Sequence, residues 1–455
     1  LLSLLPPSPG PGQVRAFAPA SPGPLSPARL RTHRGIFASP GPQPQPQPSS
    51  SFSSSFSSFS ATRLSAGLRQ YEAPDGSTLS YRYRPGSHRA RKKRKQQEKE
   101  AEAEADARPV MVPGGYDPMA SSSSSAAPPP PPPPPLDPAL VLIHPIGLGQ
   151  SSWYWEEFIN YYDGPEELLA PDLPGTGLEN GGTPYDPCSD LRASDPCCLG
   201  TDSFEAATQT VLDRYTGALG GIIGHAIEPG RPVVLVAQGG TAPLAIDMAH
   251  RLPAVIAGLV LVSPPPWSDL AGPPLPALER RKRLAGLSRA VAKYQTMERT
   301  PGAWALYCSR KLFGSRSPDG LWMEQSTRPE RRGEAYHSVL EMAAAGTLLR
   351  SRSRERELRS LVQPLLVVVG DDPASSPRRT RGQRKAGEFL DGVPACEVAV
   401  VKGKDVLPHE NPVGVRDAVR SLLRRTAEAG TDEGGGAGFG NACRATAAPA
   451  TTACL

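Results

Sequence analysis

Few residues in the patterned part of this sequence combine acid–base chemistry with a place at the end of a strand. Asp371 and Asp372 directly follow an apolar run, Leu361 to Gly370, and His409 stands further along the chain. A carboxylate there can act as a general base on water, with the histidine as proton shuttle. Thr241 is a more remote candidate nucleophile. An aspartate after a strand can equally cap a loop, so both interpretations stay open.

The elements around these residues read as strand, sharp turn and helix. The β-branched and aliphatic run Pro232 to Val236 breaks at the glycine pair Gly239-Gly240, and an apolar helical pattern follows over Leu244 to Leu252. A second apolar run, Gly258 to Val262, ends before three prolines. The unit is therefore βαβ and predicts a parallel sheet.

The turn Val236-Ala237-Gln238-Gly239-Gly240-Thr241-Ala242 resembles the nucleophile elbow of the α/β-hydrolase family. The resemblance implies an α/β fold: a mostly parallel central sheet flanked by helices, with a helical cap at about 268–360. The family places serine at the tip of the turn, where this sequence has Gly239. A glycine has no side chain to attack a carbonyl, so the covalent step of ester or amide hydrolysis loses its usual nucleophile.

The other two positions of the family's triad match unequally. The acid corresponds to Asp372 or Asp371. In the family, the triad histidine lies two residues before the first proline of the segment that corresponds to 405–412. This sequence has Val406 at that position. His409 resembles a neighbour of that histidine. Losing both nucleophile and base suggests that hydrolysis is no longer selected for.

The resemblance also implies an oxyanion hole. The expected strand Ala139 to Ile143 is followed by His144-Pro145-Ile146, where the family has a His-Gly pair. Pro145 replaces that glycine, but the N–H groups of Ile146 and Gly240 persist and can still form the hole. The residues expected to contact a ligand are Ile146, Gly240, Gly239, Gln238 and His144.

The periodic part of the chain is about the size of one large α/β domain. Its expected organisation is a transit-peptide-like disordered segment at 1–66, a β-hairpin of the core at 67–86, a charged, Ser-rich and Pro-rich insertion at 87–136, the core with its cap at 137–425, and a disordered tail at 426–455.

The composition of the first 70 residues suggests a subcellular location. The first 70 residues contain no Asp or Glu but several arginines and a Ser/Phe run, a composition typical of an organelle transit peptide and here of a plastid one. Seven cysteines without a Cys-x-x-Cys pair argue against a disulfide framework and a zinc site. Cys188, Cys197 and Cys198 share a polar loop. We expect neither a metal nor a cofactor.

Three functions compete. The first is a non-hydrolytic plastid protein binding a small apolar ligand that carries a carboxylate or phosphate. The second is an ester or lipid hydrolase of altered mechanism that uses Asp372 or Asp371. The third is a structural or interaction role through the stretch His88 to Pro135. The basic cap could meet an anionic membrane surface. No nucleic-acid partner is expected, because an acidic run neighbours the basic run Arg91 to Lys95.

Overall fold

The computed structural model describes residues 67–86, 137–147, 149–183, 201–271, 273, 275–314, 317–327, 339, 342–343, 352–371, 381–393 and 396–432. These all belong to one compact unit. The transit-like segment, the insertion at 87–136, the three-cysteine loop and the chain after Asp432 lie outside the described residues.

One eight-stranded sheet organises the described part of the chain, in the order β1-β2-β4-β3-β5-β6-β7-β8. The hairpin strands are antiparallel, β2 also pairs antiparallel with β4, and all later pairs are parallel. The strands are β1 (Gly67–Glu72), β2 (Thr78–Arg84), β3 (Ala139–Ile143), β4 (Glu167–Pro171), β5 (Val233–Gln238), β6 (Ile256–Val262), β7 (Leu365–Asp371) and β8 (Cys396–Lys402). The sheet is thus mostly parallel, as the βαβ pattern predicts.

The central strands are apolar along their whole length because both faces of the sheet are covered. Side chains alternate between the faces, so Val233, Leu235 and Ala237 of β5 join one core cluster. Val234 and Val236 join the other. This explains why the runs read as continuous rather than alternating.

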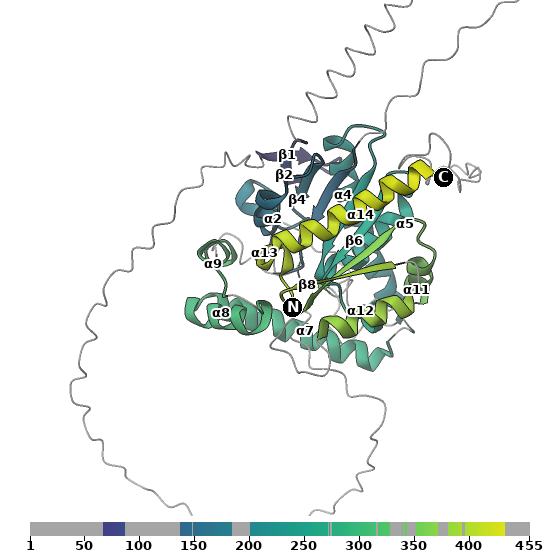
Figure 1. Cartoon of the computed structure of the whole chain (residues 1–455). Coiled ribbons are helices and arrows are strands. Elements are labelled where there is room, and N and C mark those ends of the chain that lie inside the picture. The colour runs from purple at the N-terminus through teal and green to yellow at the C-terminus, as the bar shows by residue number, and fades with distance from the viewer. Residues whose placement is uncertain are drawn as a thin grey trace, which may run out of the picture. The chain divides into compact units, whose positions relative to one another are not determined.

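Helices flank the sheet on both sides (Figure 1). The first cluster gathers α4 (Thr201–Ala226), α5 (Ala242–Arg251), α11 (Arg352–Arg359) and α12 (Arg381–Gly392). The second gathers η2 (Ser152–Trp155), α2 (Glu156–Tyr161), α13 (Leu407–Glu410) and α14 (Pro412–Asp432). In Figure 1, α14 crosses the near face of the sheet in yellow.

A helical cap lies in the sequence between β6 and β7, where the family resemblance places it. It comprises α6 (Trp267–Leu270), α7 (Ala277–Glu298), α8 (Pro301–Tyr307), η5 (Cys308–Leu312) and α9 (Gly320–Thr327). Helix α11 falls within the expected cap range but belongs to the core. Its Leu358 is buried in the first cluster, and the Glu357 carbonyl lies 2.7 Å from His250 Nε2 of α5.

The last helix ends later than the expected domain organisation places the end of the core. Helix α14 continues to Asp432, past the boundary at Arg425 that was expected between the core and a disordered tail. The added residues include Ala427, Glu428 and Ala429, which favour helix, and the Thr426 hydroxyl donates to the carbonyls of Leu422 and Leu423. No helix within the described residues is both long and apolar enough to cross a membrane.

Candidate functional site

The elbow after β5 has the backbone that a nucleophile turn requires. Gln238 ends the strand in extended conformation, and η4 (Gly239–Thr241) leads directly into α5. Gly239 adopts φ +63°, in the left-handed region that glycine favours. A Cβ built on Gly239 meets no heavy atom within 4 Å. The tip of the turn therefore faces open space and carries no side chain.

Thr241 lies inside the turn. Its hydroxyl is fully buried and donates to the Gln238 carbonyl at 2.9 Å. That bond closes the turn between strand and helix. A hydroxyl engaged in this way stabilises the elbow and is not directed at a substrate.

The segment after β8 lies against the elbow. Gln238 Nε2 donates to the Asp405 carbonyl at 2.6 Å, and Asp405 is followed by Val406. Val406 is buried and packs in the second core cluster. The position next to the elbow where the family carries its base thus holds an apolar side chain that cannot take a proton.

His409 is held by the cap. Its ring is fully buried on α13, and its Nε2 lies 3.3 Å from an Asp319 carboxylate oxygen just before α9. The rings of Trp153, Trp322 and Phe313 surround it, with centroids 5.1 to 6.3 Å away. These contacts make His409 part of the joint between core and cap.

Of the two candidate acids, the structure describes Asp371 and not Asp372. Asp371 is the last residue of β7 and pairs with Lys402 across to β8. Its Oδ1 is shielded from solvent and has no hydrogen-bond partner among the described residues. Asp372 lies outside the described residues, so its role stays a prediction.

Two N–H groups follow adjacent strand ends near the elbow. Ile143 of β3 pairs with Ala237 of β5, and Ile146 and Gly240 each lie three residues further on. Gly240 belongs to the first turn of the elbow helix, where N–H groups have no intrahelical acceptor. The positive end of the helix dipole also points there. This edge of the sheet is suited to an anionic or carbonyl oxygen.

A small pocket lies beside the same loop. About 10 Å³ of it can hold the centre of a water molecule, which is room for roughly one water. Its lining consists of His144, Pro145, Ile146, Gly147, Leu173, Thr176, Tyr215, Val339 and Met342. Gly239 and Gly240 do not line it, so this pocket borders the candidate oxyanion loop without being the space in front of the elbow.

His144 supports that loop. Its Nε2 accepts the Leu173 N–H at 3.1 Å, and its Nδ1 lies 3.0 Å from the Pro145 carbonyl. Burial lowers the pKa of His144 by more than the negative charge of Asp172 raises it. The ring is therefore neutral, with its proton on Nδ1. Asp172 is itself structural, since it accepts from the Ser152 N–H and the Ser80 hydroxyl, both at 2.5 Å.

Sequence reasoning overlooked Ser263. This residue follows β6, and the register pairs Gln238 with Val262, which puts Ser263 beside Gly239 at the strand ends. Its φ of +46° is unusual for a residue with a side chain, and its buried hydroxyl has no partner among the described residues. Lys385 Nζ, also buried, donates to the next carbonyl, of Pro264, at 2.9 Å. The sequence signal that could have identified Ser263 was its position directly after the strand next to the elbow strand.

A second overlooked feature is the polar group behind the elbow. The hydroxyl of Tyr154 is fully buried without a partner among the described residues. Burial, followed by the charges of Asp405 and Glu410, raises the pKa of Tyr154 well above its ordinary value. Gln238 Oε1 and Asp405 Oδ2 likewise lack described partners. No sequence pattern joins these residues, because they come from three distant segments.

The residues around the elbow define a protein of the α/β-hydrolase class without the elbow nucleophile. The family model described as "Alpha/beta hydrolase family" matches residues 140–418. The chain therefore belongs to the α/β-hydrolase family. Among curated proteins, none matches the sequence.

Several solved structures are similar to this chain at low sequence identity. A thermophilic esterase from Thermogutta terrifontis is 17% identical, with 79% of this chain and 99% of that chain covered and a TM-score of 0.47. A putative lipase from Acinetobacter baumannii AYE is 14% identical, with 80% and 93% covered and a TM-score of 0.48. Haloalkane dehalogenase DbeA from Bradyrhizobium elkani USDA94 is 17% identical, with 79% and 98% covered and a TM-score of 0.43.

The described side chains include no group of three or more His, Cys, Asp or Glu that could hold a metal ion. What the described site offers is a pair of N–H donors, a neutral supporting histidine, and carboxylates at the strand ends.

Proposed function

We propose that this protein is a non-hydrolytic member of the α/β-hydrolase family that binds a small apolar ligand bearing a carboxylate or phosphate. One observation carries the proposal: Gly239 occupies the left-handed tip of the elbow in front of open space. The neighbouring base position holds the buried Val406. Covalent catalysis from this elbow has neither its attacking atom nor its proton acceptor.

The ligand class is inferred from the groups that remain. The N–H of Gly240 at a helix start and the N–H of Ile146 are donors suited to an anionic oxygen. The side chain of Ile146 packs against the apolar second core cluster. An anionic head on an apolar body matches both parts.

Binding is tested by filling the space in front of Gly239. Asparagine tolerates the left-handed region and would place its amide there, so Gly239→Asn should abolish the binding of octanoate and octyl phosphate measured by calorimetry. The matched control is Gly230→Asn, a turn glycine with φ +82° and equally open space, which should bind like the wild type. Wild-type protein that binds neither probe, or equal binding by both variants, would contradict the proposal.

The second candidate, a hydrolase of altered mechanism, has its own observation. Asp371 ends β7 and Ser263 directly follows β6, the two strands next to the elbow strand in the sheet order, and each has a shielded oxygen without a described partner. A carboxylate there could act as a general base on water. A panel of short-chain and long-chain p-nitrophenyl esters separates the candidates. Turnover that is lost in Asp371→Asn, Asp372→Asn or Ser263→Ala would establish the hydrolase, and no turnover above buffer would support the binding protein.

A further inference from the structure

The long cap helix α7 exposes one narrow face. Exposed residues recur at Leu278, Lys282, Arg289 and Lys293, a spacing that keeps them on one side of a helix. Leu287, Val291 and Tyr294 are buried on the opposite side, where they join the second core cluster. The exposed face is therefore fixed by how α7 packs on the molecule.

The charge of this face has one sign. None of its described side chains is acidic, because Glu279 lies off the face and pairs with Arg283 at 3.3 Å. Arg283 also reaches Asp269. From residue 277 to residue 314 the sequence has nine Lys or Arg and two Glu. The positive charges that stay exposed are thus not neutralised by their described neighbours.

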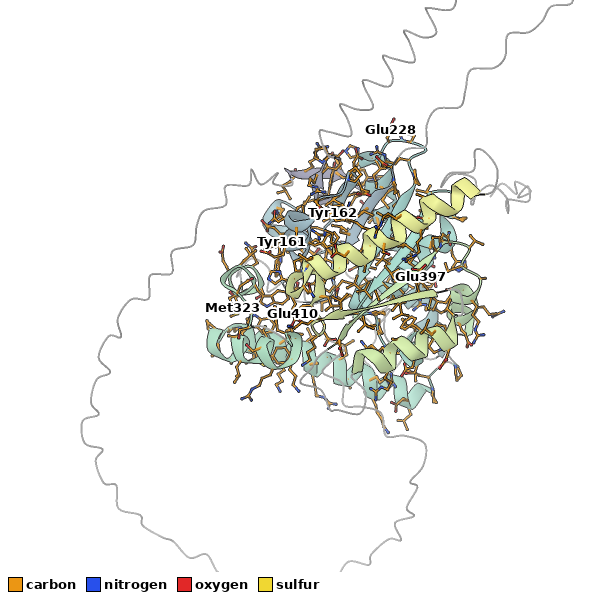
Figure 2. The ribbon with its side chains drawn as sticks, viewed as in Figure 1. Tyr161, Tyr162, Glu228, Met323, Glu397 and Glu410 are labelled. Carbon is orange, nitrogen blue, oxygen red and sulfur yellow. The ribbon has the colours of Figure 1, made fainter. Side chains whose placement is uncertain are left out.

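The next cap elements extend the same character. Arg299 after α7 is exposed, as are Arg310 and Lys311 in η5. Two leucines stand among these cations, Leu278 at 65% exposure and Leu306 of α8 at 52%. Figure 2 shows nitrogen-tipped side chains extending outward from the cap helices. We name the set Leu278, Lys282, Arg289, Lys293, Arg299, Leu306, Arg310 and Lys311 the cap face.

We propose that the cap face binds the surface of an anionic lipid bilayer. Clustered cations near such a surface are each attracted by its negative potential. Isolated exposed leucines suit the boundary between headgroups and acyl chains. Among the described side chains of the cap face there is no aromatic ring to stack on a base, which favours lipid over nucleic acid as the occupant. The proposal is independent of what the elbow binds.

The test is cosedimentation of the full chain with vesicles. Phosphatidylcholine vesicles containing phosphatidylglycerol should bind the protein, and vesicles of phosphatidylcholine alone should not. The variant Lys282→Gln/Arg289→Gln/Lys293→Gln should bind about 100-fold more weakly, at roughly five-fold for each cation. Added salt should weaken the wild type toward the same level.

A matched control keeps the change in net charge constant. Arg384→Gln/Lys402→Gln/Arg424→Gln removes three exposed cations from α12, β8 and α14 and should bind like the wild type. Leu278→Ser/Leu306→Ser should give a smaller loss that persists in high salt. The proposal is overturned if control and cap variants lose binding equally, if only changes in Arg91 to Lys95 abolish it, or if the cap cations support binding to duplex DNA and not to vesicles.

Discussion

Gly239 and Gly230 provide a direct test of the elbow at the scale of one residue. Both have left-handed backbones, and a Cβ meets no heavy atom within 4 Å at either. Serine at either position should therefore cost only backbone strain, about 1 kcal/mol of the free energy of unfolding. Urea unfolding of Gly239→Ser and Gly230→Ser should give similar losses. A Gly239→Ser chain that fails to fold would show that the turn is not an elbow.

Gly239→Ser should also stay inactive on p-nitrophenyl esters, since Val406 cannot accept the serine proton. Adding Val406→His should raise turnover above that of the single variant by a factor on the order of 100, the usual contribution of a positioned base. If Gly239→Ser alone is as active as the double variant, another residue already supplies the base.

His144 predicts a dependence of stability on pH. Burial lowers its folded pKa below the unfolded value of 6.5. The unfolded chain then binds more protons, so stability is lost as pH falls through the unfolded pKa. Between about pH 7.5 and about pH 5.5 this group should remove up to about 1.4 kcal/mol from the free energy of unfolding. His144→Gln keeps an acceptor for the Leu173 N–H and should lose that part of the dependence.

The control for this measurement is His225→Gln, because His225 is exposed on α4. Urea unfolding at both pH values should show the wild-type pH dependence in this control. A wild-type protein that is equally stable at both values, or a His144→Gln variant with the full dependence, would contradict a neutral His144.

At this scale, the sequence predicted only some of the contacts around the elbow. The glycine pair after an apolar run was enough to locate the elbow, since strand, turn and helix are consecutive in the chain. The contact between His409 and Asp319 was not predictable, because 90 residues separate them and neither stands in a periodic pattern. The bond from Gln238 to the Asp405 carbonyl joins residues 167 apart.

At the scale of elements, α4 contains glycines that weaken it. Gly217 and Gly224 are exposed, and a Cβ on either meets nothing within 4 Å. Alanine at each should stabilise the protein by about 0.5–1 kcal/mol, because glycine loses more backbone entropy in a helix. Gly221→Ala is the contrast, since its Cβ would lie 2.5 Å from the Tyr71 hydroxyl of β1. The midpoint temperature of thermal unfolding should rise for the first two variants and not for Gly221→Ala. A lower midpoint in all three variants would mean that α4 is not a regular helix there.

Strand identity was easier to predict than helix extent. Buried parallel strands leave continuous apolar runs, and Ala139 to Ile143 was expected with the bounds that β3 has. Helix ends depend on local hydrogen bonds and on packing, so α14 runs past its expected end and α11 belongs to the core rather than to the cap. Local sequence and hydrogen bonds decided the first case, and tertiary contacts decided the second.

At the scale of the whole molecule, the acid-free first 70 residues predict a subcellular location that the folded part does not specify. Residues 1–66 fused after a start methionine to a fluorescent protein should carry it into plastids of plant cells, because transit sequences depend on unopposed positive charge. The matched fusion with Arg15→Glu, Arg29→Glu, Arg31→Glu and Arg34→Glu should stay outside. Mitochondrial fluorescence, or plastid import of both fusions, would show that this composition is not a plastid signal. A plastid result would also define the membranes against which the cap face should be tested.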